Sequence, residues 1–177
     1  MMAAGLLTVE EFFAQLYGTA DESLNPGNAG RSFNNHFATR NVNSDGEWLD
    51  LTRQKNSAAD LSPTASHMPR LLGLALASKL FRHNPELASI NGISNQGNEV
   101  AFGTIGDSST SEGHFFETMN AAGVLQIPLA VAVWDDGYGI SVPTSVQTTK
   151  ASISKALRGF EKGDEETGIA IYEGRGW

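Results

Sequence analysis

Residues 103–143 limit the possible folds of this chain more than any other stretch. Two short apolar runs, 100–105 and 129–134, frame it, and the second is rich in β-branched residues. Between them, the segment 109–125 opens with hydroxyl side chains that can cap a helix and continues with apolar residues at helical spacing, before Pro128 breaks the chain. A strand, a helix and a second strand predict a βαβ unit with parallel strands. We therefore expect an α/β fold with a doubly wound parallel sheet.

Acidic residues follow both predicted strands: Asp107 the first, Asp135 and Asp136 the second. Ligands of such folds bind at the carboxyl ends of the strands. Asp136 follows Asp107 by 29 residues, enough for one helix and one return strand, so the two acids can face each other. Carboxylates without Cys or His beside them suit Mg²⁺, which often shares its ligands with phosphate, and the amides of Ser108 and Ser109 can bind an anion at a helix start. The spacing alone also allows these acids to be simple turn formers.

The composition excludes several kinds of site and partner. A formal net charge of −8 leaves no basic footprint for nucleic acid. The absence of cysteine excludes a disulfide framework and a thiolate metal site, and it fits a reducing compartment. No stretch is apolar enough to span a membrane, and the first residues lack the features of a signal peptide. We therefore expect a cytoplasmic protein without nucleic-acid or membrane partners.

A chain of 177 residues is expected to form one domain, 1–177. Within it, the segment 23–60 is rich in Asn, Gly and Ser and predicts a long irregular structure. A third apolar run, 168–172, is typical of a strand but has no closing helix after it. This ending indicates that the domain is incomplete at its C-terminus.

Two further helices are expected before the central stretch. Thr8 to Glu11 resembles a cap and first turn, and apolar residues at helical spacing predict a core-facing helix up to Gly18: Phe12, Phe13, Leu16 and Tyr17. The second helix, 69–83, carries many leucines and is expected to be well buried. The loop before it, 62–67, is compatible with a simple connection and with a ligand loop of small polar side chains. His36 is more typical of a surface histidine than of a catalytic one.

The central motifs resemble those of a known family. They are Gly106-Asp107-Ser108, Glu112-Gly113, Asn120-Ala121-Ala122 and the run from Asp135 to Ser145. Together they look like the thiamine diphosphate motif of the alpha subunit of 2-oxo acid dehydrogenase E1 components, which begins with Gly-Asp-Gly and ends with Asn-Asn. The continuation Ile-Ser-x-Pro-Thr-Ser is most similar to the branched-chain (2-oxoisovalerate) type. The loop 62–69 is similar to the family's Ser-Pro-Leu-Ala-Thr-Gln-x-Pro, and 30–36 to its Gly-Arg-x-x-x-x-His.

The resemblance implies a thiamine diphosphate-binding fold, truncated at the C-terminus, that holds the diphosphate through Mg²⁺. The implied metal ligands are the side chains of Asp107 and Asp136 and the carbonyl oxygen of Tyr138. The implied cofactor-binding residues are Gly106, Asp107, Ser108, Ser109, Asp136, Tyr138 and Ile140, with Ser62 and Thr64 near the thiamine end. A loop that holds a monovalent cation in some relatives is matched by Leu61, Pro63, Ser66 and His67, which makes K⁺ a further expected cofactor. No catalytic residue is expected in this segment, because a beta-type domain supplies the catalytic glutamate.

The implied function is the alpha-type part of an E1 oxidoreductase in branched-chain amino acid catabolism. This enzyme decarboxylates a 2-oxo acid oxidatively and transfers the acyl group to a lipoyl group on E2, within a multienzyme complex. The expected partners are a beta-type E1 subunit or domain, the lipoyl-bearing E2 and further copies in an oligomer. The segment alone is expected to be inactive. Two alternatives stay open: another thiamine diphosphate enzyme of the transketolase kind, and a non-catalytic assembly module of the same fold.

Four positions depart from the family pattern. Ser108 replaces a glycine, Asp136 replaces an asparagine, Trp134 stands in place of an arginine that faces the diphosphate, and His67 replaces a glutamine. The family's histidine-bearing loop over the diphosphate follows the third strand and is absent from this sequence. These differences are the support for the assembly-module alternative.

Overall fold

The computed structural model describes residues 1–176 except 33–35, 60 and 165. These residues form two compact units, Met1–Ser62 with Ala88–Asn95, and Pro63–Leu87 with Gln96–Trp177. Parts of the predicted irregular segment and of the Gly-Arg-x-x-x-x-His stretch lie outside the described residues. The assignment of 1–177 to one incomplete domain stays a prediction. No helix in the described part of the chain is long and apolar enough to cross a bilayer.

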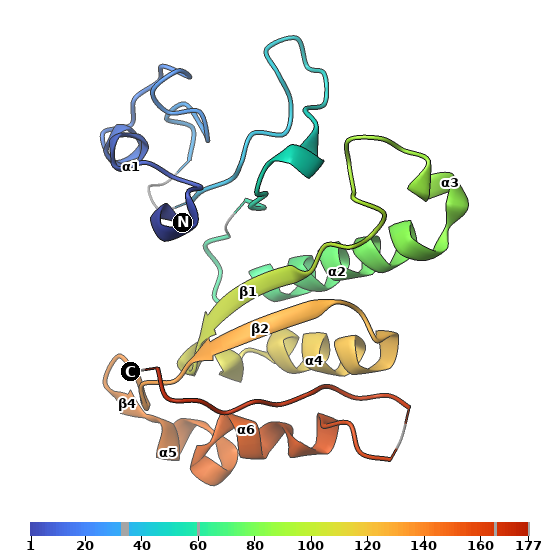
Figure 1. Cartoon of the computed structure of the whole chain (residues 1–177). Helices are drawn as coiled ribbons and strands as arrows, with labels where there is room; N and C mark the ends of the chain where they lie inside the picture. The colour runs from blue at the N-terminus through green and yellow to red at the C-terminus, as the bar shows by residue number, and fades with distance from the viewer. Residues whose placement is uncertain (33–35, 60, 165, 177) are drawn as a thin grey trace. The chain divides into compact units, whose positions relative to one another are not determined.

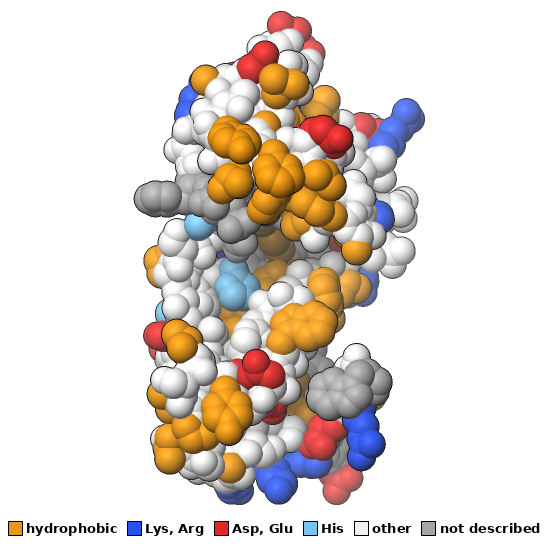
Figure 2. Space-filling view, turned by 90° about the vertical axis from the view of Figure 1, so that its left-hand side faces the viewer, with side chains coloured by type: hydrophobic (Ala, Val, Ile, Leu, Met, Phe, Trp, Pro, Cys, Tyr) orange, Lys and Arg blue, Asp and Glu red, His pale blue; other side chains and the backbone are white. Residues whose placement is uncertain are grey.

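The first unit begins with the 3-10 helix η1 (Met2–Ala4) and the helix α1 (Val9–Leu16). The predicted cap is confirmed: Glu11 N donates to Thr8 Oγ1 at 3.1 Å, and Thr8 N donates to Glu11 Oε2 at 2.8 Å. The prediction of a core-facing helix is wrong for most of its apolar residues, since the side chains of Phe13, Leu16 and Tyr17 are exposed. The buried position is Gln15, whose Nε2 donates to the carbonyl oxygen of His36. Figure 2 shows hydrophobic side chains on the surface of this unit, in the upper half of the view.

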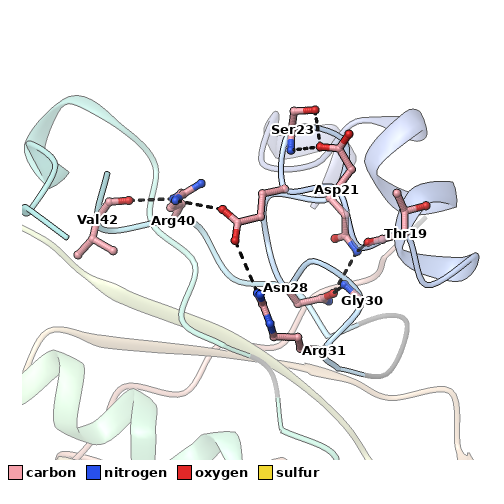
Figure 3. A network of polar contacts seen from close by, with 10 residues as sticks. Thr19, Asp21, Ser23, Asn28, Gly30, Arg31, Arg40 and Val42 are labelled. Atoms are coloured by element: carbon pink, nitrogen blue, oxygen red, sulfur yellow. Dashed lines mark hydrogen bonds and ion pairs between the residues drawn. The ribbon is translucent and has the colours of Figure 1, made fainter. Parts of the chain in front are cut away.

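Most of the described part of 23–60 is irregular, apart from η2 (Leu51–Arg53) and a single bridge between Val42 and Trp48. Figure 3 shows the polar contacts that organise it. Oδ1 of Asp21 accepts from both the backbone N and Oγ of Ser23, at 2.8 and 2.6 Å. The carboxylate of Glu22 lies 3.8 Å from Arg31 and 3.6 Å from Arg40. Short-range polar contacts of this kind hold turns in place where regular ladders are absent.

The second unit contains the predicted βαβ motif (Figure 1). Strand β1 (Ala101–Gly106) pairs in parallel with β2 (Leu129–Trp134), from Ala101 opposite Leu129 to Gly106 opposite Trp134. The helix α4 (Gly113–Leu125) connects them. The second strand has the predicted bounds, and the first begins one residue later than expected. The predicted α/β class with a parallel sheet is therefore confirmed.

Shorter elements surround this motif. The helix α2 (His67–His83) begins two residues before the predicted start and is followed by α3 (Pro85–Ala88). After β2 come a small antiparallel pair, β3 (Tyr138–Gly139) and β4 (Val142–Pro143), and the elements α5 (Thr144–Gln147), η4 (Thr149–Ala151), α6 (Ile153–Ala156) and η5 (Leu157–Phe160). The expected third strand is not formed. Ile169 makes only an isolated bridge with Glu161, because the segment around Glu161 is irregular and offers no regular strand to pair with.

One apolar core holds the second unit together. Its buried members come from the turn before α2 and from α2, β1, α4, α6 and η5: Ala65, Met68, Leu71, Ile105, Phe115, Met119, Ile153 and Leu157. The predicted burial of α2 was too broad, since Leu74 and Leu80 are exposed. A Cβ on Gly103 would lie 2.1 Å from Cδ1 of Leu71, so α2 packs directly against the backbone of β1. This close packing fixes the strands beneath the loops at their carboxyl ends.

Candidate functional site

The two loops that follow β1 and β2 meet at the carboxyl end of the sheet. Pairing of the strands continues one step into the loops, since Asp107 N donates to the carbonyl oxygen of Trp134 at 3.1 Å. The first loop enters a 3-10 helix, η3 (Ser108–Ser111), and the second carries the β3–β4 pair. Both strand ends therefore present acidic residues at one edge, as the sequence predicts.

Asp107 is the buried acid of this edge, with 4% of its surface exposed. Its Oδ1 accepts from Ser108 N at 2.7 Å, and its Oδ2 accepts from Gly137 N at 3.2 Å and from Oγ1 of Thr144 at 3.3 Å. These donors are neutral, and Asp107 takes part in none of the ion pairs found among the described residues. A buried carboxylate without a positive partner is costly, and its lone pairs can accept more than these three contacts. The environment of Asp107 therefore fits a cation.

Asp136 and Tyr138 lie on the second loop, and both are exposed. Oδ1 of Asp136 accepts from Tyr138 N at 3.1 Å, and Oδ1 of Asp135 accepts from Gly137 N at the same distance. Gly137 N thus joins this loop to Asp107 as well. The described residues contain no cluster of three or more His, Asp or Glu side chains that could hold a metal ion. A cation here would need backbone and ligand oxygens besides the two carboxylates, which is the usual situation of Mg²⁺ bound to a phosphate compound.

The predicted helix cap at Ser109 and Thr110 is wrong. The helix α4 begins only at Gly113, with Glu112 as its N-cap, and η3 lies between strand and helix. The reason is that Thr110 is buried and its hydroxyl donates back to the carbonyl oxygen of Asp107, so it cannot cap a helix here. The amides of Ser108 and Ser109 therefore belong to the 3-10 turn, and Ser108 N is bonded to Asp107.

Ile140 stands out in the second loop. Its side chain is fully exposed, and its backbone has φ of 59°. A β-branched residue in the left-handed region is uncommon and strained. Figure 2 looks onto this end of the second unit, where Tyr138 on β3, Val142 on β4 and Val146 on α5 have exposed side chains.

The loop 62–67 is divided between the two units. In the first, Oγ of Ser62 lies 2.6 Å from Nε2 of His36. In the second, Nε2 of His114 contacts the carbonyl oxygen of Thr64 at 3.0 Å, and Nε2 of His67 contacts that of Thr104 at 2.9 Å. Because a carbonyl oxygen only accepts, both of these nitrogens carry a proton. Ser66 Oγ donates to the carbonyl oxygen of Pro63, and Leu61 is half-buried.

Sequence reasoning missed two residues of the site around Asp107. Thr144 and Gln147 lie on α5, where Thr144 binds Asp107 and Gln147 binds Ser108. The sequence feature that could have indicated them is the run of hydroxyl- and amide-bearing residues directly after Pro143. In the first unit, the sequence marks His36 through the stretch that resembles the family's Gly-Arg-x-x-x-x-His, but it does not predict the contact of His36 with Ser62.

The chain resembles known proteins over most of its length. Residues 1–162 match the family described as Dehydrogenase E1 component. Over 140 residues the chain is 29% identical to the 2-oxoisovalerate dehydrogenase subunit alpha, mitochondrial, of Caenorhabditis elegans. The aligned region covers 79% of this chain and 26% of that protein. Over 139 residues it is 24% identical to the 2-oxoisovalerate dehydrogenase subunit alpha of Bacillus subtilis strain 168. This aligned region covers 78% of this chain and 34% of that protein.

The chain thus spans between a quarter and about a third of the length of these relatives. The family match includes both parallel strands, the helix between them and the two loops around Asp107. On this match the chain belongs to the dehydrogenase E1 component family, with alpha subunits as its relatives.

Proposed function

We propose that this chain is the alpha-type part of a 2-oxo acid dehydrogenase E1 and that it binds the diphosphate of thiamine diphosphate through Mg²⁺. The observation that carries the proposal is Asp107, a buried carboxylate held by neutral donors at the carboxyl end of a parallel sheet. In a chain of the E1 family, this is where a cation and an anionic ligand would be needed together.

Each residue has a defined part in this proposal. The side chains of Asp107 and Asp136 and the carbonyl oxygen of Tyr138 would hold Mg²⁺. Gly106, Ser108 and Ser109 would form the turn beside the diphosphate, Ile140 would contact the cofactor, and Ser62 and Thr64 would approach its thiamine end. When bound, thiamine diphosphate supplies the electron sink for decarboxylation of a 2-oxo acid. The residues of this chain bind and orient it.

A monovalent-cation site is the least supported part of the proposal. It would use the loop of Leu61, Pro63, Ser66 and His67, and K⁺ is the expected ion. The carbonyl of Pro63 already accepts from Ser66, and the ring of His67 is bonded to the carbonyl oxygen of Thr104. The support for this ion is the resemblance of the loop alone.

The substrate and partners are proposed on the names of the relatives. A branched-chain 2-oxo acid is the proposed substrate, because both alpha subunits are named for 2-oxoisovalerate. The proposed partners are a beta-type E1 subunit or domain and a lipoyl-bearing E2 in a multienzyme complex. The exposed apolar side chains of Ile140, Val142 and Val146 give a beta-type partner a surface to cover. A cytoplasmic location stays a prediction, since one relative is named as mitochondrial.

A non-catalytic assembly module is the second candidate. Two observations favour it: Asp136 adds a negative charge beside the proposed diphosphate, and Trp134 is exposed at the strand end where the resemblance leads one to expect an arginine. The transketolase-like alternative is disfavoured by the match to the E1 family.

The test is calorimetric titration of the assembly of this chain with its beta-type partner. We expect thiamine diphosphate to bind only when Mg²⁺ is present, Asp107→Ala to abolish binding, and the exposed control Glu117→Gln on α4 to bind normally. An assembly that binds no cofactor would support the non-catalytic module. A lipoyl-linked assay with a branched-chain 2-oxo acid tests the reaction, and turnover by this chain alone would contradict the need for a partner.

A further inference from the structure

Gln147 lies on α5, directly after the β3–β4 pair, and its side chain contacts the loop that follows β1. Its Nε2 lies 2.7 Å from the carbonyl oxygen of Ser108 and 2.8 Å from Oγ of Ser108, and Oγ of Ser108 lies 3.0 Å from Oε1 of Gln147. A fourth contact, from Nε2 to Oγ of Ser111, is longer at 3.2 Å. Since a carbonyl oxygen only accepts, the atom nearest to it must be the amide nitrogen, and this sets the orientation of the side chain.

The contact depends on the serine that stands at position 108. A glycine there would keep only the bond to the carbonyl oxygen, whereas the hydroxyl of Ser108 both donates to Gln147 and accepts from it. The two residues are 39 positions apart: Ser108 begins η3 after β1, and Gln147 ends α5, which follows the β3–β4 pair. Ser108 therefore adds a cross-link between the loops.

Gly139 makes room for this cross-link. A Cβ at Gly139 would lie 1.7 Å from Oγ of Ser108, 2.7 Å from Cβ of Ser108 and 3.2 Å from Oε1 of Gln147. Its backbone is not among those with a positive φ, so the position needs glycine for space and not for conformation. Ser108, Gly139 and Gln147 thus form one interlocked unit, which we call the loop latch.

The loop latch lies beside the proposed metal ligands in the chain. Ser108 follows Asp107 directly, and Gly139 follows Tyr138. Gly137 N and the hydroxyl of Thr144 donate to Oδ2 of Asp107. The two sets of contacts together determine where the second loop stands relative to Asp107. Removal of a group that hydrogen-bonds to a metal ligand and orients it typically lowers metal affinity by about 10–100-fold.

We propose that Gln147 is a positioning residue for the Mg²⁺–diphosphate site and acts through Ser108, with Gly139 as the position that must stay without a side chain. The proposal rests on the proposed function, since it concerns the same site. Gln147 itself need not touch the metal or the diphosphate. It keeps the loop after β1 at the distance from the loop after β2 that the metal ligands on both loops require.

The first experiment measures the affinity of the chain, assembled with its beta-type partner, for thiamine diphosphate over a series of Mg²⁺ concentrations. We expect Gln147→Ala to weaken binding about 10-fold or more, by analogy with other residues that orient metal ligands. Ser108→Ala should weaken it as well, and the double variant should be no weaker than Gln147→Ala. The control is Lys155→Ala, an exposed residue on α6 outside the proposed site and partner surface, which should bind like the wild type.

The second experiment needs no cofactor. Gly139→Ala should lower the midpoint of thermal unfolding through its clash with Ser108, and adding Ser108→Gly should restore most of the loss. Equal unfolding midpoints for the single and double variants overturn the interlock.

The outcomes separate the two proposals. If the wild-type assembly binds the cofactor and Gln147→Ala binds it equally well, the positioning role is overturned and the proposed function stands. A wild-type assembly that binds no cofactor overturns the proposed function and the positioning role together, while the suppression of Gly139→Ala by Ser108→Gly is measured independently.

Discussion

The backbone N–H of Gly137 donates a hydrogen bond of 3.2 Å to Oδ2 of Asp107, and so ties the loop after the second strand to the acid after the first. Gly137 has φ of 84°, a left-handed backbone that glycine adopts without strain. The contact explains how two exposed residues, Asp136 and Tyr138, are held near a buried carboxylate. The following predictions start from this arrangement.

Asp107→Asn should destabilise the chain and remove Mg²⁺-dependent cofactor binding. The asparagine amide would place N–H groups against Ser108 N–H or against Gly137 N–H, because both oxygens of Asp107 accept bonds. Leaving a buried donor without an acceptor costs about 1–3 kcal/mol. Urea unfolding without cofactor checks the first effect and calorimetry the second. Asp135→Asn is the control, since its single acceptor role toward Gly137 can be kept by the amide oxygen. Unchanged stability of Asp107→Asn would contradict the described hydrogen bonding.

Asp136→Asn should have two opposite effects on cofactor binding. The amide oxygen can still accept from Tyr138 N, so the turn is kept. Loss of one negative charge should raise the affinity for thiamine diphosphate at saturating Mg²⁺, because repulsion of the diphosphate falls. It should also raise the Mg²⁺ concentration needed for half-saturation, because the cation loses an anionic ligand. Both effects should shrink with added salt. A variant whose Mg²⁺ requirement is unchanged would argue against Asp136 as a ligand.

His36→Ala should lower turnover of the assembled enzyme more than it lowers stability. Its Nε2 lies 2.6 Å from Oγ of Ser62, a residue that we expect near the thiamine end of the cofactor. Ser62 is exposed, so loss of this contact should change the free energy of unfolding by less than about 0.5 kcal/mol. Initial rates with a 2-oxo acid, compared with urea unfolding of the same protein, provide the measurement. Ser62→Ala should reproduce the loss of rate, and full activity of both variants would show that the contact has no part in function.

Gly103→Ala should destabilise the second unit by about 1–3 kcal/mol, the usual cost of overfilling a packed core. The new Cβ would meet Cδ1 of Leu71 at 2.1 Å, and Leu71 belongs to the buried core. The matched control is Gly73→Ala on α2, where a Cβ meets nothing within 4 Å. That change should stabilise the helix by roughly 0.5–1 kcal/mol. Urea unfolding of both variants gives the comparison, and a neutral Gly103→Ala would contradict the close packing of α2 on β1.

Ser23→Ala should raise the pKa of Asp21. The hydroxyl of Ser23 is the main cause that holds this pKa below its usual range, followed by its backbone N–H. A lowered pKa stabilises the folded state above the usual carboxyl pKa, and this contribution is lost as the pH falls through the lowered value. The carboxyl resonance followed by NMR against pH gives the measurement. Asp50 is an internal control, because its lowered pKa depends mainly on the hydroxyl of Thr52 and should not change.

The parts of the fold that depend on neighbouring residues were predictable. The runs 100–105 and 129–134 appear as parallel strands with bounds within one residue, and the capping box at Thr8 is present. Apolar periodicity and cap residues act over a few positions, so they can be read without the tertiary structure.

Other elements could not be predicted because they depend on distant partners. The buried face of α1 carries Gln15 and not Phe13, because Nε2 of Gln15 donates to the carbonyl oxygen of His36. The start of α4 moved to Gly113 because Thr110 is buried and bonded to Asp107. The run 168–172 lacks a regular partner and forms only a bridge.

The sequence by itself determined that two strands and a helix follow one another and that acids stand at both strand ends, because hydrophobic periodicity and breaker residues are local. It also pointed to the E1 family through the motif around Asp107 and Asp136. Only the tertiary structure decided that Asp107 is buried among neutral donors and that Ser108, Gly139 and Gln147 interlock. The physical reason is that hydrogen bonding and steric exclusion between residues more than thirty positions apart depend on how the loops fold together over the end of the sheet.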